Sequence, residues 1–347
     1  MNSGKVIIGI VGLRFGEDII KHLMPPHPAH EYFEIGGIFD LNETRSRAVA
    51  SRWGLKEYAS MDEMLADSKI EAIGLFTPPT GRAGLLLSMI EAGKHVMTTK
   101  PIEFNPERLE EVLREARKTN RIIHANSPGP RPTVDMRQMD QWREQYDLGR
   151  IISVRGEVWA SYAEKADNGW YDNFLACPAA PILRLGVYLI NDFIHVAGEP
   201  VQMQIMTSRI RTGRPTPDNA VLQLRSADGC LGTIFASFCI DDGDSYRNAL
   251  TINFERGTIY RNCGPNKSTT HMRESEVTLI RGTGCRRTEL VHLYVDDISG
   301  NYLWQDFYKE VRSGASLSKA YEARMIASAR AISRLAEAQQ VVINEGE

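Results

Sequence analysis

The sequence contains no long hydrophobic run, since no apolar stretch approaches the roughly 18–20 residues that a membrane-spanning helix needs. It also lacks a large excess of charge of either sign, because the formal net charge of its 347 residues is −3. Such a balance argues against nucleic acid and against a membrane surface as partners. What remains is a globular protein, and the 42% hydrophobic and 24% charged residues are typical of one.

Cysteine is scarce and its spacing indicates no special site. The five cysteines are an odd number and include no CxxC pair, which argues against a zinc site and against a disulfide framework. No other grouping of ligand residues predicts a metal. Met1–Lys5 leads directly into an expected strand, so no secretory signal is expected. The sequence therefore predicts a cytoplasmic protein with reduced thiols.

Residues 1–125 alternate between strand-like and helix-like segments. Short apolar runs predict strands at 6–11, 33–39, 72–76, 95–97 and 121–125. The helices between them begin at recognisable caps, which are Asn42, Ser60 with Glu63, and Asn105 before Pro106. This alternation predicts a doubly wound parallel sheet, and hence an α/β Rossmann domain over 1–125.

The pattern changes in residues 126–347. Apolar residues alternate with polar ones at 201–205, 220–224 and 250–254, as in strands with one buried face. Asp228-Gly229 predicts a hairpin turn, and helices are expected near 134–146, 185–197, 302–312 and 318–340. The chain is long enough for two domains. The second is predicted to be an α+β domain with a large, mainly antiparallel open sheet.

The first strand runs into a glycine-containing loop and then a helix. Gly12 and Gly16 bracket Leu13-Arg14-Phe15, and a dinucleotide pyrophosphate binds at such a helix N-terminus. Arg14 stands where a GxGxxG pattern has its second glycine, and its guanidinium is suited to a phosphate. The alternative is a surface arginine in a loop that binds no nucleotide.

Asp40 ends the second predicted strand. A carboxylate there accepts hydrogen bonds from the adenosine ribose and repels a 2′-phosphate, which favours NAD over NADP. Arg14 and Arg45 would relieve that repulsion if their guanidinium groups lie close to the phosphate, so NADP stays possible. The alternative role of Asp40 is to cap a helix.

The segment from Gly93 to Pro101 places a lysine after a short strand at 95–97. Pro101 has a fixed φ and biases Lys100 toward an extended conformation. Because open α/β sheets bind ligands at the carboxyl ends of their strands, we expect the Lys100 ammonium at such a crevice.

Together these segments resemble the glucose–fructose oxidoreductase and inositol dehydrogenase (Gfo/Idh/MocA) family of NAD(P)-dependent enzymes. The resemblance extends through Thr77-Pro78-Pro79, Ala92–Val96 and Gly186–Asn191 to the closing helices. It implies that Thr77 and Pro78 shape the channel beneath the nicotinamide, and that Arg82 replaces a common histidine. A structural turn without ligand contacts is the alternative for 77–79.

The resemblance aligns Lys100 with the lysine of the family's Glu-Lys-Pro motif, with Thr99 in place of the glutamate. It implies that the ammonium binds the reacting hydroxyl and polarises the developing carbonyl. Without the neighbouring carboxylate, the lysine should be less anchored and easier to deprotonate. A surface lysine before a proline is the alternative.

Arg184, Tyr188 and Asn191 occupy the positions of the family's Asp-x-x-x-His-x-x-Asp pattern on the helix beside the substrate. The resemblance assigns the acid/base role to Tyr188. Its reference pKa of about 10 is high for a base at neutral pH, but the cations Lys100 and Arg184 would lower it. The alternative is a core tyrosine in a decayed site.

Four aromatic residues fall in segments that line the substrate crevice in relatives. They are Trp159, Tyr162, Trp170 and Tyr171. Aromatic faces suit the C–H faces of sugars, although core packing is the alternative for each. Of these, Trp170 is our candidate substrate contact.

We therefore expect an oxidoreductase that transfers a hydride between NAD and a secondary alcohol or ketone of a sugar, cyclitol or related polyol. One alternative, motivated by the altered motif positions, is a non-catalytic nucleotide-binding regulator. Another, motivated by Arg131 and Arg184, is a dehydrogenase of a carboxylated ring alcohol. The resemblance also implies a homodimer or homotetramer.

Overall fold

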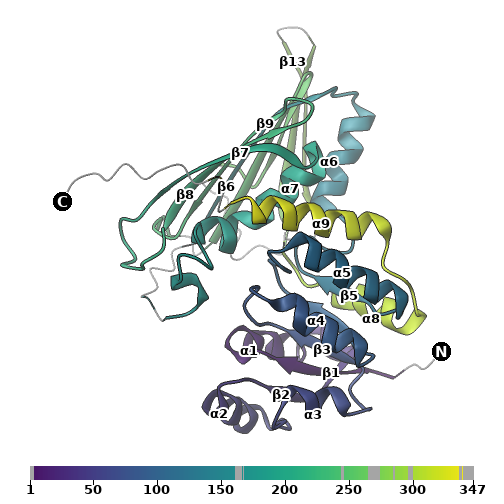
Figure 1. Ribbon diagram of the computed structural model, residues 1–347. Coiled ribbons are helices and arrows are strands. Elements are labelled where there is room, and N and C mark those ends of the chain that lie inside the picture. The colour runs from purple at the N-terminus through teal and green to yellow at the C-terminus, as the bar shows by residue number, and fades with distance from the viewer. Residues whose placement is uncertain are drawn as a thin grey trace. The chain divides into compact units, whose positions relative to one another are not determined.

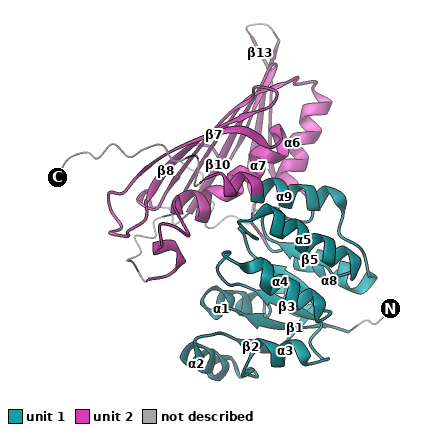
Figure 2. Cartoon of the chain, in the orientation of Figure 1, with its two compact units in different colours: residues 1–130, 302–329 teal, residues 131–301, 330–347 magenta. Residues whose placement is uncertain are grey.

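The computed structural model describes residues 4–160, 166, 168–243, 246–264, 274–283, 286–295, 300–335 and 338. The chain forms two compact units (Figure 2). Unit 1 contains residues 1–130 and 302–329, and unit 2 contains residues 131–301 and 330–347. This division differs from the predicted boundary after residue 125, because residues 302–329 return to pack on the first sheet.

Unit 1 is built on a five-stranded parallel sheet with the order β2-β1-β3-β4-β5 (Figure 1). Its strands are β1 (Val6–Val11), β2 (Phe33–Phe39), β3 (Ala72–Leu75), β4 (His95–Thr98) and β5 (Ile123–Ala125). Chain order reverses between β1 and β3, which is the topological switch point of a doubly wound fold. The predicted Rossmann-like sheet is thus confirmed.

The helices of unit 1 begin where the sequence signals predict. Asn42, Ser60 and Asn105 each accept a hydrogen bond from the backbone N–H three residues later, at 2.9, 3.0 and 2.8 Å. The helices are α1 (Leu13–His22), α2 (Glu43–Trp53), α3 (Met61–Ala66), α4 (Arg82–Glu91), α5 (Pro106–Lys118), α8 (Trp304–Ser313) and α9 (Lys319–Ser333), with a 3-10 turn at Pro28–Glu31. These side-chain caps fix the helix starts.

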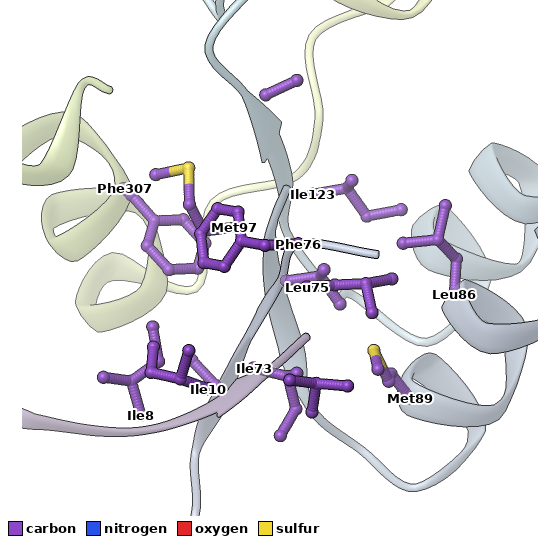
Figure 3. Close-up of a cluster of buried hydrophobic side chains, with 14 of the residues drawn as sticks. Ile8, Ile10, Ile73, Leu75, Phe76, Leu86, Met89, Met97, Ile123 and Phe307 are labelled. Atoms are coloured by element: carbon purple, nitrogen blue, oxygen red, sulfur yellow. The ribbon is translucent and has the colours of Figure 1, made fainter. Parts of the chain in front are cut away.

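The core of unit 1 lies on both faces of the parallel sheet. Figure 3 shows Ile8, Ile10 and Phe307 on one side of the strands and Leu86 and Met89 on the other. All five side chains are fully buried. Helix α4 therefore covers one face, and α8, more than two hundred residues further along the chain, covers the other.

The C-terminal segment is also tied to unit 1 by polar contacts. His124 Nε2 lies 2.9 Å from Glu310 Oε2, and the Ala125 N–H donates to the Tyr321 hydroxyl at 2.9 Å. Arg324 donates to the carbonyl oxygen of Pro130 at 2.9 Å. These contacts fix β5 and the chain that follows it.

Unit 2 is built on an eight-stranded sheet with the order β13-β12-β11-β10-β6-β9-β8-β7. Its strands are β6 (Ile151–Ala160), β7 (Pro200–Ser208), β8 (Asn219–Ser226), β9 (Leu231–Ser237), β10 (Tyr246–Phe254), β11 (Gly257–Arg261), β12 (Ser275–Thr283) and β13 (Arg286–Val295). Only the β6–β9 pair is parallel. The predicted large, mainly antiparallel sheet is confirmed, including the hairpin between β8 and β9.

The helices of unit 2 are α6 (Val134–Gln145) and α7 (Val187–Ala197). The sequence predicted one helix over about 185–197, but a π-helical turn, η3 (Ile182–Gly186), precedes α7. A short 3-10 helix, η2 (Trp170–Asp172), comes before it in the chain. π-Helical turns are rare and occur often at functional sites.

Two properties of the described residues bear on function. Within them, no helix is both long and apolar enough to cross a membrane, and no three His, Cys, Asp or Glu side chains are grouped as metal ligands. Cys177, Cys230, Cys239 and Cys263 are free thiols; Cys285 lies outside the part of the chain that the structure describes.

Candidate functional site

The predicted site residues of unit 1 lie along one edge of the parallel sheet. Gly12, Asp40, Thr77, Lys100 and Asn126 each follow the carboxyl end of a different strand, within one or two residues. Because all five strands are parallel, these residues share the edge where open α/β sheets bind ligands. Asn126 was not singled out from the sequence, although its place after β5 was a usable signal.

The loop after β1 requires both of its glycines. Gly12 has a φ of 85°, and a Cβ there would lie 2.9 Å from the carbonyl carbon of Phe76. At Gly16 a Cβ would lie 3.0 Å from Ile10 Cγ2, so this glycine lets α1 pack closely on β1. No side chain caps α1 at Gly12. A tight glycine loop that opens into a helix N-terminus fits a dinucleotide pyrophosphate.

Two of the three side chains between these glycines, those of Arg14 and Phe15, are accessible. Phe15 is 43% exposed, and its ring meets Phe76 edge-on at 5.9 Å between centroids. Arg14 is exposed on the first turn of α1. A cation at a helix N-terminus opposes the helix dipole, and a bound phosphate would offset that cost.

The Asp40 carboxylate is held against the glycine loop. Its Oδ2 accepts the Leu13 N–H at 2.7 Å, and its Oδ1 accepts the Asn42 N–H at 2.8 Å. Arg45 Nη1 lies 3.4 Å from both oxygens. The side chain of Asp40 therefore does cap α1, and it also places a carboxylate beside the loop, where a ribose could donate to its remaining lone pairs.

Thr77 and Pro78 lie at the end of β3. Pro78 is exposed, and the Thr77 hydroxyl is buried without a hydrogen-bond partner among the described residues. A buried hydroxyl without a partner is costly unless something completes it. This orphaned atom at the ligand edge fits the predicted cofactor channel.

The backbone at Lys100 is fixed by the side chain of Asn126. The Lys100 N–H donates to Asn126 Oδ1 at 2.9 Å, and the Thr99 hydroxyl lies 3.4 Å from the same oxygen. Thr98 Oγ1 donates to the Leu75 carbonyl at 2.8 Å, which ties β4 to β3. The Lys100–Pro101 peptide is cis. The hydrogen bond from its N–H to Asn126 anchors the backbone of Lys100.

The buried guanidinium of Arg82 joins two loops of this edge. The residue is 1% exposed, and its Nη2 donates to the carbonyl oxygen of Thr77. Its Nη1 contacts the carbonyl oxygens that surround Lys100, those of Thr99 at 2.7 Å, Ile102 at 3.2 Å, and Pro101. The sequence showed only that an unusual residue stood here; burial and these contacts were not readable from it.

In unit 2, the three altered motif positions share one accessible stripe. From 177 to 193, Arg184, Tyr188 and Asn191 are partly exposed, and every other residue is buried. Their spacing of four and three residues places them on one face of the helix. The structure thus brings these three predicted residues together, and Tyr188 is not enclosed in the core.

Backbone and aromatic faces surround this stripe. A Cβ at Gly300, whose φ is 96°, would lie 2.6 Å from Tyr188 Cε1. The Arg184 guanidinium carbon lies 5.0 Å from the centroid of the Tyr171 ring and 5.5 Å from that of Phe238. Cation–π contacts of this length hold an arginine in place.

The predicted substrate aromatic Trp170 belongs to η2, which is firmly attached to its unit. The Trp170 and Tyr171 rings lie 4.0 Å apart. Buried Arg214 donates to Asp172 at 2.8 Å, and Thr216 Oγ1 donates to the Tyr171 carbonyl at 2.6 Å. Sequence reasoning missed these two anchors, since neither lies near η2 in the chain.

The other candidates are differently placed. Trp159 lies on β6 beneath the Arg247 guanidinium, 5.2 Å from its carbon, and Tyr162 lies outside the described residues. Arg131 is exposed before α6. His195, to which no role was assigned, meets Asp140 at 2.8 Å.

Behind the stripe, Arg261 forms a buried ionic cluster. Its Nη1 donates to Asp135 at 3.0 Å and its Nη2 to Asp192 at 2.7 Å. Burial raises the pKa of Asp192, against the lowering effect of Arg261. Burial alone would lower the pKa of Arg261, but the two carboxylates raise it. Removing one member would leave a buried charge unpaired, so α6, α7 and β11 are held together.

Comparison with known proteins agrees with this arrangement. Residues 6–127 match the oxidoreductase family with an NAD-binding Rossmann fold, and residues 136–260 match the GFO/IDH/MocA C-terminal domain. The chain belongs to the Gfo/Idh/MocA family. It therefore has an NAD(P)-binding Rossmann domain and is an oxidoreductase, as the sequence predicted.

Individual relatives of this family align over different lengths. Myo-inositol 2-dehydrogenase of Thermotoga maritima is 24% identical over 88% of each chain. An oxidoreductase of Rhizobium meliloti, ORF334, is 31% identical, but the chain spans only about half of its length, 54%. D-glucoside 3-dehydrogenase of Escherichia coli is 25% identical over 58% of this chain and 56% of its own.

Two solved structures share the fold of both units. A 3-ketoreductase from Actinomadura kijaniata, in complex with NADP and TDP-benzene, has a TM-score of 0.73 at 14% identity, over 97% of this chain and 98% of its own. An NAD-binding protein from Listeria innocua has a TM-score of 0.70 at 19% identity, over 96% and 95%. At such identities the similarity shows the Gfo/Idh/MocA fold alone.

Proposed function

We propose that this protein is a dehydrogenase or reductase acting on a secondary alcohol or ketone of a sugar, cyclitol or related polyol. The observation that carries the proposal is the anchored Lys100 segment at the ligand edge of an NAD(P)-binding sheet. Relatives named as inositol and glucoside dehydrogenases support the substrate class. Bound NAD(P) would accept or supply the hydride.

The residues of the chain then carry the proton and the charge. In the oxidative direction the Lys100 ammonium donates a hydrogen bond to the reacting oxygen, which stabilises the negative charge that develops there. Tyr188 takes the hydroxyl proton and passes it to solvent, and it returns a proton in the reductive direction. Arg184 and Asn191, on the same stripe, and Trp170 would bind the substrate.

For the cofactor we propose Gly12, Arg14, Phe15 and Gly16 around the pyrophosphate, with Asp40 at the adenosine ribose. Thr77, Pro78 and Lys100 would lie along the nicotinamide half. The support is the glycine loop at the start of α1, the Asp40 carboxylate beside that loop and the orphaned Thr77 hydroxyl.

We expect NAD to bind more tightly than NADP, and Asp40→Ala to narrow the difference. A like charge at about 4 Å costs about 1 kcal/mol in water and about 4 kcal/mol near a protein surface, so the preference should lie between about fivefold and several hundredfold. Calorimetric titration of both nucleotides measures it. Asp40 also holds the glycine loop through the Leu13 N–H. Asp40→Ala should therefore weaken the binding of both NAD and NADP, and the ratio of the two affinities is the quantity that tests the assignment.

Arg45→Ala is the matched control for this ratio, because it removes the cation next to Asp40. It should leave NAD affinity nearly unchanged and weaken NADP. Tighter binding of NADP than of NAD by the unaltered protein would reverse the ribose assignment.

The test of the function itself is the reaction. Purified protein should carry or bind NAD(H) or NADP(H), and a panel of cyclitols, hexoses and glycosides should change the absorbance of the reduced nicotinamide. Binding without any turnover would favour a nucleotide-binding regulator. Turnover confined to sugar acids would favour a carboxylated ring alcohol, for which the position of Arg184 between two aromatic rings is the supporting observation.

We also propose a homodimer or homotetramer formed through the large sheet. Several large apolar side chains are exposed on its strands, namely Ile152, Val201, Met206, Leu231 and Leu290. Light scattering should give a mass of two or four 39.0 kDa chains. Leu231→Arg, on β9, should lower that mass, whereas Leu41→Arg, at an exposed leucine of unit 1, should not. A light-scattering mass of one chain for the unaltered protein would contradict this proposal.

A further inference from the structure

We infer that Arg82 is a positioning residue for Lys100, which it holds in register with the Thr77 turn. This inference rests on the proposed function of Lys100. Arg82 is the first residue of α4, and its guanidinium lies between the loop after β3 and the loop after β4. It acts on these two loops through the backbone, because its hydrogen bonds to them go to carbonyl oxygens.

The pattern of contacts is specific to the segment around Lys100. One nitrogen of Arg82 bonds the carbonyl oxygens of Thr99, Pro101 and Ile102, which precede and follow that lysine. The other nitrogen bonds the carbonyl of Thr77. A planar guanidinium presents donors in a fixed fork. The distance between the two loops is therefore set by one rigid group.

A second contact joins the same elements. Glu103, which is buried, accepts the Ala83 N–H in the first turn of α4 at 2.7 Å, and also accepts the N–H groups of Phe104 and Asn105 at 2.7 and 3.2 Å. The start of α4 is thus attached to residues 99–105 through a side chain from each partner. Asn126, which follows β5, accepts the Lys100 N–H. The backbone around Lys100 is therefore held both by α4 and by the residue after β5.

Positioning matters because catalysis by an ammonium depends on sub-ångström placement at the reacting oxygen. A lysine side chain has four flexible bonds, so its reach is defined only if its Cα is fixed. If Arg82 fixes it, loosening Arg82 should reduce turnover and change the reactivity of the Lys100 amine, while nucleotide affinity should fall less.

Two substitutions of Arg82 distinguish the effect of its planar set of donors from the effect of its positive charge. Arg82→Lys retains a cation with a single donor group and should keep part of the function. Arg82→Met removes all donors. We expect turnover to fall about tenfold to a hundredfold in Arg82→Met, and less in Arg82→Lys, with a smaller change in the nicotinamide nucleotide Kd.

Lys94→Met is the matched control. Lys94 is also a buried cation of unit 1, and its Nζ donates to the carbonyl oxygens of Asp67 and Ile70 at 2.8 and 2.7 Å. It precedes β4, whereas Lys100 follows it, so it lies at the opposite end of the strand. Loss of Lys94 should lower thermal stability without altering turnover in the remaining folded protein.

Two measurements need no substrate. Amide exchange should accelerate in Arg82→Met in peptides covering both 75–82 and 98–105, and the rate at which Lys100 is acylated should change several-fold, both read by mass spectrometry. Neither should change in Lys94→Met. Unchanged exchange and labelling, or normal turnover despite loosened loops, would overturn the inference. An unaltered protein that oxidises no polyol, with the labelling change present, would instead overturn the proposed function and leave the Arg82 assignment intact.

Discussion

Replacing Lys100 with methionine is expected to reduce turnover by about a hundredfold or more while nucleotide binding stays near normal. Methionine keeps much of the stem volume and removes the ammonium. The backbone around residue 100 should persist, because Asn126 and Arg82 bind it through main-chain atoms. The loss should therefore report the missing charge and donor rather than a displaced loop.

Steady-state rates and nucleotide titration of Lys100→Met decide this. Lys94→Met is the control for removing a cation of unit 1, since Lys94 precedes β4 and lies at the end of the strand away from the ligand edge. Turnover of Lys100→Met within a few fold of the unaltered enzyme would show that Lys100 has no catalytic role and would favour the alternative of a surface lysine.

Replacing Tyr188 with phenylalanine should cut turnover sharply and remove one ionisation from the alkaline side of the activity profile. The change deletes a single hydroxyl, so the ring contact with the Gly300 backbone is retained and the fold should be unaffected. Proton relay by a positioned group contributes about 10²- to 10⁴-fold, which sets the expected loss.

The pH–rate profile distinguishes a relay from a packing role. If the phenol titrates, Tyr188→Phe should leave a profile that lacks this limb, whereas Tyr171→Phe, at a ring that contacts Trp170, should keep it. An unchanged rate in Tyr188→Phe would contradict the proton-relay role of Tyr188. Inactivity of the unaltered protein toward every polyol would favour a nucleotide-binding regulator.

Local signals explain why so much of the fold was predictable. Caps at Asn42, Ser60 and Asn105 act within three residues, and alternation of apolar residues reports the face of a strand directly. The stripe of Arg184, Tyr188 and Asn191 was identified through the resemblance to the family's motif, and the helical spacing of these positions predicted that they share one face.

Other features depend on pairs that are distant in sequence and could not be read from it. The contact of Arg82 with the segment around Lys100 spans about twenty residues, and that of Arg214 with Asp172 spans about forty. Arg261, Asp135 and Asp192 come from three separate elements. In each case the sequence shows a charged residue of ordinary appearance, and only the fold shows that it is buried and what it binds.

The packing of α8 on the first sheet has a consequence for synthesis on the ribosome. Phe307 and its neighbours cover the face that contains Ile8 and Ile10, yet residues 131–301 must be made first. At a translation rate of about 5–20 residues per second, that face stays without α8 for roughly ten to forty seconds. During this interval residues 131–301 are synthesised while the apolar face of unit 1 stays uncovered. The order of translation thus makes completion of the nucleotide-binding unit one of the last events of folding.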